Sequence, residues 1–352
     1  MNIRVIAPNL KRRLSGVTST VIRLVPLQAR QIEIRATGPA LPAHVPQISL
    51  AALPILPRAP RRVWHARRNV EMIAGLALKH VARKNLALMF TSASQRPHTW
   101  LTRWLIARMD AVVATSEKSR AFLKVPATVI HHGIDTGVFR PAPDRAALRA
   151  RLGLPQGARL IGCFGRIRAS KGTDRFVEAM IRCLPDHPDA IALVMGRAVD
   201  KDRDFLADLR DRICVADLTD RIRFLPEVPV EATPDWYAAL DLYVAPQRSE
   251  GFGLTPLEAA ACGVPTIATD VGAFSDIIAE GKTGTLLPDG DPETIARAVD
   301  ALLRDHARLA RWSAACRPRV ERGFRLADEA QALVALYRDL LGEDAPARAR
   351  DA

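Results

Sequence analysis

The chain has 352 residues, of which 48% are hydrophobic and 25% charged, and its formal net charge is +13. This length allows two domains of ordinary size, and the composition is that of a globular protein rather than a disordered or fibrous one. No apolar run approaches the roughly 20 residues that cross a bilayer. The five scattered cysteines have no CxxC spacing, which excludes a compact metal cluster, and no secretory signal is evident, so we expect a reducing cytoplasm.

The first half of the chain alternates apolar segments with helical patterns. Strands are predicted at residues 2–7, 31–35, 86–91 and 111–115, with a helix from about residue 17 and a strand followed by a long helix over residues 61–82. The proline-rich residues 39–60 are predicted to be irregular.

The second half alternates more clearly. Strands are predicted at residues 159–164, 190–195, 222–225, 242–245 and 264–269, and helices at 171–184, 202–214, 235–240, 255–262 and 292–303. Short apolar strands between helices predict a parallel sheet covered on both faces, which the right-handed crossover rule turns into a doubly wound α/β domain. Ligands of such domains bind at the carboxyl ends of the strands, so the loops after residues 164 and 245 are the informative ones.

These patterns predict four regions. We expect an N-terminal Rossmann-like domain at residues 1–140, an interdomain linker at 141–158 where prolines gather, and a second Rossmann-like domain at 159–322. Residues 323–352 are expected to form a C-terminal helix, placed to pack back on the first domain, and a tail.

The loop after residue 164 combines glycines with two cations. The sequence GCFGRIRASKG runs from Gly162 to Gly172 and holds Arg166 and Lys171. Backbone N–H groups at a turn, a forked guanidinium and an ammonium suit a diphosphate, next to the positive end of the following helix. The alternative is a basic loop that merely faces solvent.

A second segment, SEGFGLTPLE, runs from Ser249 to Glu258. Its two glycines allow the backbone to approach a ligand closely. Thr255 and Glu258 have the spacing of a helix capping box, with Thr255 as the N-cap, and this would explain Glu258 structurally. Glu250 has no such explanation, because it lies in a loop that follows a strand.

Together these segments resemble the retaining GT-B glycosyltransferases of family 4, the group 1 glycosyltransferases. The matching residues are Gly165 and Arg166 with Lys171 and Gly172, the pair Glu250 and Glu258 at the E-x7-E spacing, and the hinge-like HGID at 132–135. The resemblance implies two Rossmann-like domains that face each other across a cleft, a nucleotide-sugar donor, and neither a cofactor nor a bound metal.

The resemblance also implies roles for these residues. Arg166 and Lys171 would hold the donor diphosphate and stabilise the charge that grows on it, and with Glu250, beside the donor sugar, they form the catalytic set. Glu258 would bind the ribose hydroxyls, and transfer would proceed by front-face attack without a covalent nucleophile. The full donor-binding set is Gly16, Gly165, Arg166, Lys171, Glu250, Gly251, Phe252, Gly253, Leu254 and Glu258.

The first half of the chain is strongly basic. Residues 1–135 hold 21 lysines and arginines against 5 aspartates and glutamates, a net charge of +16, and the remainder is −3. A basic face attracts nucleic acid, anionic lipid headgroups or a phosphorylated glycolipid, although it can also simply keep the surface soluble.

Residues 5–20, 64–72 and 90–96 resemble lipopolysaccharide core mannosyltransferases more narrowly. This resemblance implies GDP-mannose as the donor and an anionic Kdo-lipid A precursor as the acceptor, met by a peripheral protein on the inner face of the cytoplasmic membrane. The candidate acceptor-binding residues are Lys11, Arg12, Arg13, Arg67, Arg68 and His98, and the alternative for the arginines is that they face water.

The chain departs from the family at two places. The hinge has His132 where asparagine is usual, and residues 91–94 read TSAS where many members keep a His-Asp pair. His65 and His98 are candidates to replace that pair, although a lone histidine is more often structural. Trp64, Trp100 and Trp104, interleaved with arginines, are interpreted as core packing rather than as a membrane-interface or glycan-stacking patch.

Other functions explain less of the sequence. A UDP-sugar-dependent transferase acting on another anionic glycolipid is the main alternative. A nucleic-acid-binding protein would explain the basic half but not the glutamates of the second segment, and we expect no nucleic-acid partner. A nicotinamide-dependent dehydrogenase would need a strand that ends in GxGxxG, which is missing.

Overall fold

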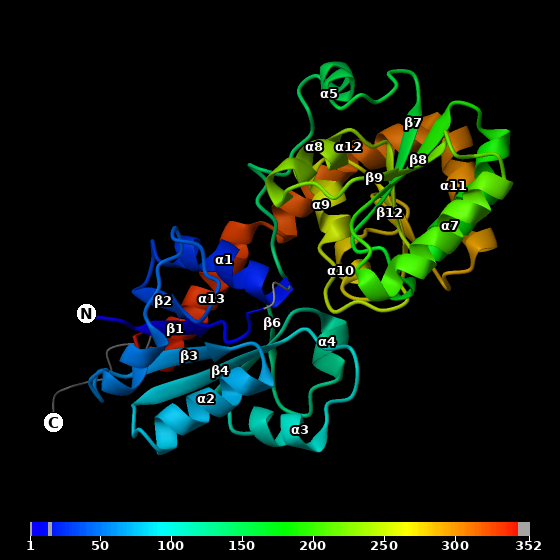
Figure 1. The fold of residues 1–352 in the computed structure, drawn as a ribbon. Coiled ribbons are helices and arrows are strands. Elements are labelled where there is room, and N and C mark those ends of the chain that lie inside the picture. The colour runs from blue at the N-terminus through cyan, green and yellow to red at the C-terminus, as the bar shows by residue number, and fades with distance from the viewer. Residues whose placement is uncertain (1, 13–15, 344–352) are drawn as a thin grey trace. The chain divides into compact units, whose positions relative to one another are not determined.

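The computed structural model describes residues 2–12 and 16–343. The chain divides into two compact units: unit 1 comprises Met1–Gly133 and Leu326–Ala352, and unit 2 comprises Ile134–Arg325 (Figure 1). Each unit holds a six-stranded sheet in which every neighbouring pair of strands is parallel. The predicted α/β class with two Rossmann-like domains is confirmed.

The sheet of unit 1 has the strand order β2-β1-β3-β4-β5-β6. Its strands are β1 (Val5–Pro8), β2 (Ile34–Thr37), β3 (Arg62–Ala66), β4 (Leu86–Ser92), β5 (Ala111–Ala114) and β6 (Thr128–Val129), and its helices are α1 (Gly16–Gln28), α2 (Asn69–His80), α3 (Trp100–Ile106), α4 (Glu117–Ala121) and α13 (Leu326–Leu341).

Alternation along the strands of unit 1 decides which helices cover which face. In β1, Val5 belongs to an apolar cluster with Leu24 of α1 and Leu333 of α13. The next residue, Ile6, points to the other face and belongs to a cluster with Met72 of α2. Burying each such side chain contributes about 2 kcal/mol. The C-terminal helix is therefore part of the core of unit 1, although it comes last in the chain.

The sheet of unit 2 has the strand order β12-β11-β10-β7-β8-β9. Its strands are β7 (Arg159–Phe164), β8 (Ala190–Met195), β9 (Ile222–Leu225), β10 (Leu242–Ala245), β11 (Thr266–Thr269) and β12 (Gly284–Leu287), and its helices are α5 (Arg145–Arg151), α6 (Thr173–Cys183), α7 (Arg203–Val215), α8 (Thr233–Ala238), α9 (Thr255–Ala261), α10 (Phe274–Ile277), α11 (Pro292–Arg304) and α12 (His306–Gly323). The sequence patterns do not predict α12, because Pro318 and many arginines interrupt its apolar periodicity.

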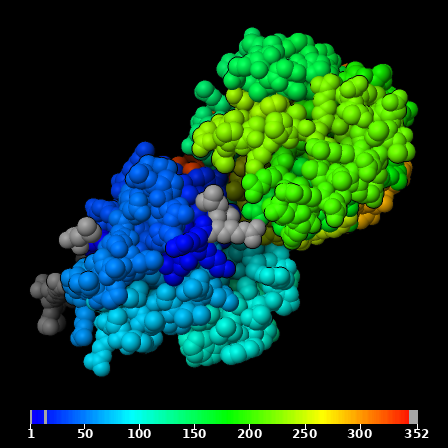
Figure 2. Space-filling model, viewed as in Figure 1, coloured from blue at the N-terminus to red at the C-terminus, as the bar shows by residue number. Residues whose placement is uncertain are grey.

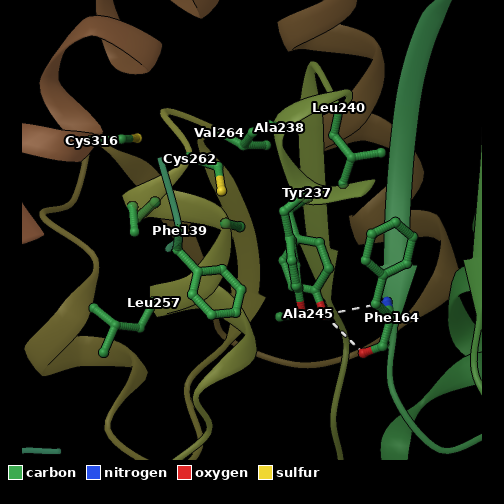
Figure 3. Close-up of a cluster of buried hydrophobic side chains, with 14 of the residues drawn as sticks. Phe139, Phe164, Tyr237, Ala238, Leu240, Ala245, Leu257, Cys262, Val264 and Cys316 are labelled. Carbon is green, nitrogen blue, oxygen red and sulfur yellow. Dashed lines mark hydrogen bonds between the residues drawn. The ribbon is translucent and has the colours of Figure 1, made fainter. Parts of the chain in front are cut away.

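An aromatic cluster fixes the end of β7, from which one of the candidate loops departs (Figure 3). The Tyr243 hydroxyl donates to the carbonyl of Phe164 at 3.0 Å and accepts from its N–H at 3.3 Å. The ring of Tyr237 packs against the ring of Phe164, with 5.0 Å between centroids. Both tyrosines are buried, so the backbone at the carboxyl end of β7 is held from one side of the sheet.

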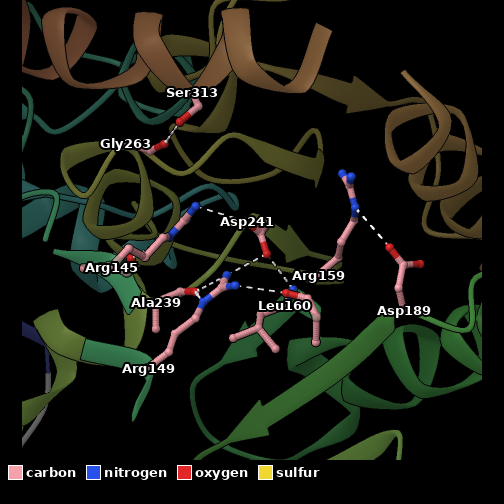
Figure 4. A network of polar contacts seen from close by, with 11 residues as sticks. Arg145, Arg149, Arg159, Leu160, Asp189, Ala239, Asp241, Gly263 and Ser313 are labelled. Atoms are coloured by element: carbon pink, nitrogen blue, oxygen red, sulfur yellow. Dashed lines mark hydrogen bonds and ion pairs between the residues drawn. The ribbon is translucent and has the colours of Figure 1, made fainter. Parts of the chain in front are cut away.

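The predicted linker at residues 141–158 packs against unit 2 and contains α5. Figure 4 shows Arg145 and Arg149 of this helix directed at Asp241, which accepts from them at 3.0 and 2.7 Å. Asp241 also accepts from the N–H of Leu160 at 2.7 Å, and Leu148 lies in the core of the unit. The linker prediction is wrong, because prolines mark only where the chain turns and the charged and apolar side chains between them are bound to the unit.

Glu329 of α13 fixes the last residues of unit 1 before the chain enters unit 2. Its carboxylate accepts from the N–H of Gly133 at 2.8 Å and lies 2.7 Å from Nδ1 of His132. The N–H of Ile134 then donates to the carbonyl of Phe324 at 2.8 Å. The histidine that replaces the usual hinge asparagine therefore has an acidic partner from the C-terminal helix.

Candidate active site

Two loops at the carboxyl edge of the unit 2 sheet form the centre of the candidate site. One follows β7 and the other follows β10, and these strands are neighbours in the sheet. Lys171 of the first loop forms an ion pair with Glu250 of the second, 79 residues further along the chain. Their side chains are 23% and 19% exposed, so the pair is sheltered and still reachable from solvent. Two residues of the predicted catalytic set are thus brought together.

A glycine allows the two loops to touch. Gly172 has a φ of +71°, and a Cβ at this position would lie 2.0 Å from the carbonyl oxygen of Pro246. An alanine would therefore meet both an unfavourable backbone conformation and a backbone clash. Lys171 directly precedes this glycine, so the close approach of the loops also sets where its ammonium can reach.

Arg248 ties the same loops together on a second side. Its N–H donates to the carbonyl of Ser170 at 3.1 Å, and its guanidinium makes a two-pronged contact with Asp174 at 2.7 and 2.6 Å. Burial raises the pKa of Asp174, but the hydrogen bonds and charge of Arg248 outweigh it and hold that pKa below its usual value. Arg248 directly precedes the segment that begins at Ser249, and nothing else in the local sequence indicates that it joins the two loops.

The loop that carries Glu250 is held by tight packing. The carboxylate of Glu250 accepts from the N–H of Gly251 at 3.0 Å. Gly253 has a φ of +88°, and a Cβ there would lie 2.2 Å from the ring of Phe274. The N–H of Ala273 donates to the carbonyl of Phe252 at 2.8 Å. The predicted donor-binding stretch 250–254 is therefore a fixed backbone.

Arg166 differs from Lys171 in its surroundings. It follows Gly165, whose N–H donates to Met195 on the neighbouring strand at 2.9 Å. The residue is exposed, and its side chain forms no hydrogen bond or ion pair with the described part of the chain. Of the two predicted phosphate-binding cations, one is fixed by Glu250 and the other extends into solvent.

The predicted capping box at Glu258 is wrong. Helix α9 begins at Thr255, and its N-cap is Leu254, which makes no side-chain cap. Leu254 already has helical backbone angles, and its carbonyl accepts from the N–H of Glu258 at 2.8 Å. The side chain of Glu258 instead hydrogen-bonds the hydroxyl of Tyr237, and burial together with this negative charge raises the pKa of Tyr237 well above its usual value.

The predicted site residues of unit 1 lie at the carboxyl ends of its strands. Lys11 and Arg12 follow β1 and are exposed, and Arg13 lies outside the described residues. Gly16 is the first residue of α1 and is exposed as well. These exposed positions at the carboxyl edge of the sheet suit an anionic ligand.

Arg68 does not face water as a free surface cation. Its guanidinium donates to Glu71 at 2.7 Å and to Asn9 at 2.9 Å, and to Thr18 at 3.1 Å. Glu71 has no exposed surface, and its other oxygen accepts from the N–H of Arg67 at 2.8 Å. Arg67 itself is buried. This network joins the loop after β1 to the loop after β3.

The two candidate histidines differ. His65 is fully buried, with Nδ1 2.6 Å from the hydroxyl of Tyr337 and Nε2 2.7 Å from that of Thr91. Burial, followed by the charge of Arg67, lowers its pKa well below 6.5, so it is neutral and structural. His98 is half-buried, and burial lowers its pKa too, helped by neighbouring arginines. His98 is the one of the two that a ligand could reach.

The three tryptophans also differ in how exposed they are. Trp64 has no exposed surface, and its indole N–H donates to the carbonyl of Glu71 at 2.8 Å, so core packing is confirmed for it. Trp100 is 72% exposed and Trp104 is 45% exposed, so the same prediction is wrong for both. The arginine interleaving that they share in sequence does not distinguish them, because burial depends on which helix face meets the sheet.

Two further features are absent from the described residues. No helix there combines the length and hydropathy that crossing a bilayer requires. Within the same residues, histidine, cysteine, aspartate and glutamate side chains form no group of three or more that could hold a metal ion.

Comparison with known proteins gives matches over nearly the whole chain. Residues 144–319 match the family model of the group 1 glycosyl transferases. The chain is 48% identical over 347 residues to the lipopolysaccharide core biosynthesis mannosyltransferase LpsB of Rhizobium meliloti, covering 97% of this chain and 98% of that protein. The corresponding enzyme LpcC of Rhizobium leguminosarum is 47% identical over 348 residues, with the same coverage.

A solved structure matches the fold at low identity. Anabaena HepE in complex with UDP superposes with a TM-score of 0.84, covering 96% of this chain and 100% of that one, at 19% identity. At this identity the likeness concerns the fold alone.

Proposed function

Since the chain belongs to the group 1 glycosyl transferases, has the GT-B fold and is a glycosyltransferase, we propose that it moves mannose from GDP-mannose to a lipopolysaccharide inner-core acceptor of the Kdo-lipid A type. The full-length identity to two lipopolysaccharide core mannosyltransferases supports this choice. That identity extends over unit 1 as well as over the residues matched by the family model, and in our proposal unit 1 binds the acceptor.

The observation that carries the proposal is the contact between Lys171 and Glu250. It joins the two loops that a nucleotide sugar would have to meet, at the edge of the sheet where ligands of such folds bind. In our proposal the ammonium of Lys171 and the guanidinium of Arg166 stabilise the departing diphosphate without a metal ion. A fixed donor of this kind contributes about 3–4 kcal/mol to a transition state in which charge develops.

The proposed transfer needs no reactant besides the two substrates. The acceptor hydroxyl oxygen bonds to the anomeric carbon while the bond from that carbon to the diphosphate oxygen breaks. The hydroxyl proton passes to the departing diphosphate, and attack from the same face retains the configuration. Glu250 would lie beside the sugar, and Glu258 would use its remaining hydrogen-bonding capacity for the ribose hydroxyls, since Tyr237 occupies part of it.

The charge of unit 1 supports an anionic acceptor. Kdo-lipid A carries phosphates and carboxylates, and the exposed Lys11 and Arg12 stand at the carboxyl edge of the unit 1 sheet. We place the enzyme at the inner face of the cytoplasmic membrane, as a peripheral protein.

A donor screen tests the proposal. The purified chain is incubated with Kdo-lipid A and, in separate reactions, with GDP-mannose, GDP-glucose, UDP-glucose or UDP-N-acetylglucosamine, and products are identified by mass spectrometry. We expect a hexose to be added from GDP-mannose, with an α linkage by NMR because the donor is an α-mannoside. Product formation only from a UDP-sugar would overturn the mannosyl assignment, and a β linkage would overturn retention.

A further inference from the structure

Helix α3 carries an exposed aromatic face. Trp100 is 72% exposed, Leu101 38% and Trp104 45%, whereas Leu105 and Ile106 on its other side are buried. The spacing of the three exposed residues puts them on one side of the helix. Apolar side chains that gather into one surface patch are typical of interaction sites, whereas single exposed ones are common on any protein. We call Trp100, Leu101 and Trp104 the α3 face.

A neighbouring helix extends the apolar surface of unit 1. Helices α2 and α3 are joined by a hydrogen bond from Asn69 to Thr102 at 2.8 Å, and both lie at the outside of the unit, light blue to cyan in Figures 1 and 2. On α2, Val70 is 42% exposed and Ile73 is 48% exposed. The apolar surface is therefore not confined to one short helix.

Cations accompany the α3 face, and its stretch of the chain lacks acids. Arg103 and Arg108 are exposed, and the guanidinium of Arg108 lies 3.6 Å from the ring centroid of Trp104. The chain has no aspartate or glutamate between Glu71 and Asp110. This mixture of indole rings and arginines matches the boundary of an anionic bilayer, where rings lie among the headgroups and guanidinium groups meet phosphates.

We propose that the α3 face docks unit 1 onto an anionic lipid surface, with Trp100 and Trp104 entering the headgroup region and Arg103 and Arg108 binding lipid phosphates. The inference rests on the proposed function in one respect, since a lipid-linked acceptor is held in a membrane. It names the surface that meets that membrane, whereas the donor chemistry belongs to unit 2. A folded protein partner would more often present acidic side chains to this basic surface in a fixed pattern. The test below distinguishes binding to such a partner from binding to lipid.

The test measures binding of the full chain to vesicles without any sugar donor. Sedimentation is compared for phosphatidylcholine vesicles and for vesicles that also contain phosphatidylglycerol, and tryptophan fluorescence is read with brominated lipids as quenchers. We expect the wild type to prefer the anionic vesicles, with quenching. Trp100→Ala/Trp104→Ala should weaken this binding about tenfold or more. Arg103→Gln/Arg108→Gln should weaken it by roughly fivefold for each charge, and only on the anionic vesicles.

Matched controls come from unit 2. Val215, at the end of α7, is 90% exposed, and Arg203 has a side chain that is 76% exposed. Val215→Ala and Arg203→Gln should leave vesicle binding within about twofold of the wild type, which is the level expected for a single exposed substitution away from the docking surface. Melting temperatures of all variants are measured by circular dichroism, and the Arg103→Gln/Arg108→Gln variant keeps the test decisive if the tryptophan variant is unstable.

Several outcomes would overturn the docking proposal. One is that both double variants bind vesicles as well as the wild type does. Another is that the unit 2 controls lose as much vesicle binding as the double variants. A third is that the wild type self-associates and the tryptophan variant abolishes this self-association without affecting vesicle binding. Mannose transfer to a water-soluble Kdo oligosaccharide is followed in parallel and should be the same in wild type and tryptophan variant. Failure of that reaction in the wild type would count against the proposed function, whereas the vesicle result depends on no donor or acceptor.

Discussion

The loop after β7 in unit 2 and the loop after β3 in unit 1 use their cations in opposite ways. In unit 2, Lys171 pairs with Glu250, which is itself partly exposed, and Arg166 extends into solvent. In unit 1, Arg68 follows β3 and turns inward to Glu71, which has no exposed surface. A cation at the end of a strand is available to an anionic ligand only when no desolvated carboxylate holds it, because breaking a buried pair leaves an uncompensated charge. Net charge alone does not reveal this difference.

The largest expected effect is that of Lys171→Ala on turnover. Turnover should fall about thousandfold, because a fixed cation that stabilises a leaving group is lost. Stability should change by less than about 1 kcal/mol, since the pair with Glu250 is partly exposed. Transfer from GDP-mannose and thermal unfolding check both expectations. Lys201→Ala, an exposed lysine of the same unit, is the control, and equal turnover in the two variants would remove the role of Lys171.

The second largest effect is expected on the stability of unit 1. Glu71→Gln should destabilise the protein by about 3 kcal/mol, because Arg68 loses the charge of its buried partner. Urea unfolding measures this loss. Glu117→Gln is the control, since the ion pair between Glu117 and Arg120 is more than half exposed and should matter by less than about 1 kcal/mol. Similar losses in the two variants would contradict the contrast between buried and exposed pairs.

Gly172→Ala is expected to have an intermediate effect in unit 2. A methyl group there would strain the backbone and press on the carbonyl of Pro246, which should destabilise the protein by about 2 kcal/mol and move Lys171 enough to lower turnover. Gly153→Ala isolates the backbone cost, because Gly153 has a φ of +66° and no atom within 4 Å of an added Cβ. If Gly153→Ala lost as much stability and turnover, the close approach of the loops would not matter.

His65 predicts a pH dependence of stability that originates in unit 1. Its pKa in the folded protein lies well below the 6.5 of an unfolded chain, so the unfolded state takes up a proton first as the pH falls. Stability should then decrease by about 1 kcal/mol for each pH unit below 6.5 until the folded histidine also titrates. His98 contributes in the same direction, so the difference between wild type and His65→Gln isolates His65. Identical slopes of unfolding free energy between pH 6.5 and 5 would show that His65 does not titrate as described.

The smallest effect is expected from the exposed cations of unit 1. Lys11→Gln/Arg12→Gln should raise the KM for Kdo-lipid A by roughly fivefold for each charge that contacts the acceptor, through weaker attraction to its phosphates. The KM for GDP-mannose and the melting temperature should stay the same, because both side chains face solvent. An equal rise in the donor KM would show that these cations are not selective for the acceptor.

Sequence patterns predict the sheet of unit 2 closely. Its strands β7, β8, β9 and β10 have the predicted bounds, because strands buried on both faces are short apolar runs that end at glycines or polar loops. The helix that starts near Thr255 is also predicted, but its cap is not. The N-cap is Leu254 rather than Thr255 because of the backbone angles at Leu254, which the sequence does not reveal. The side chain of Glu258 contacts Tyr237, and this partner comes from another helix.

By itself the sequence determined the two doubly wound units, the family and the two segments that meet at Lys171 and Glu250, because periodicity, glycines and motif spacing are local properties of the chain. Only the tertiary structure decided which charged and aromatic side chains are available. It turned Arg68 toward a buried carboxylate, buried Trp64, exposed Trp100, and attached residues 141–158 to unit 2. The physical reason is that burial and ion pairing depend on partners distant in sequence, such as Glu71 and Asp241, and no local pattern contains them.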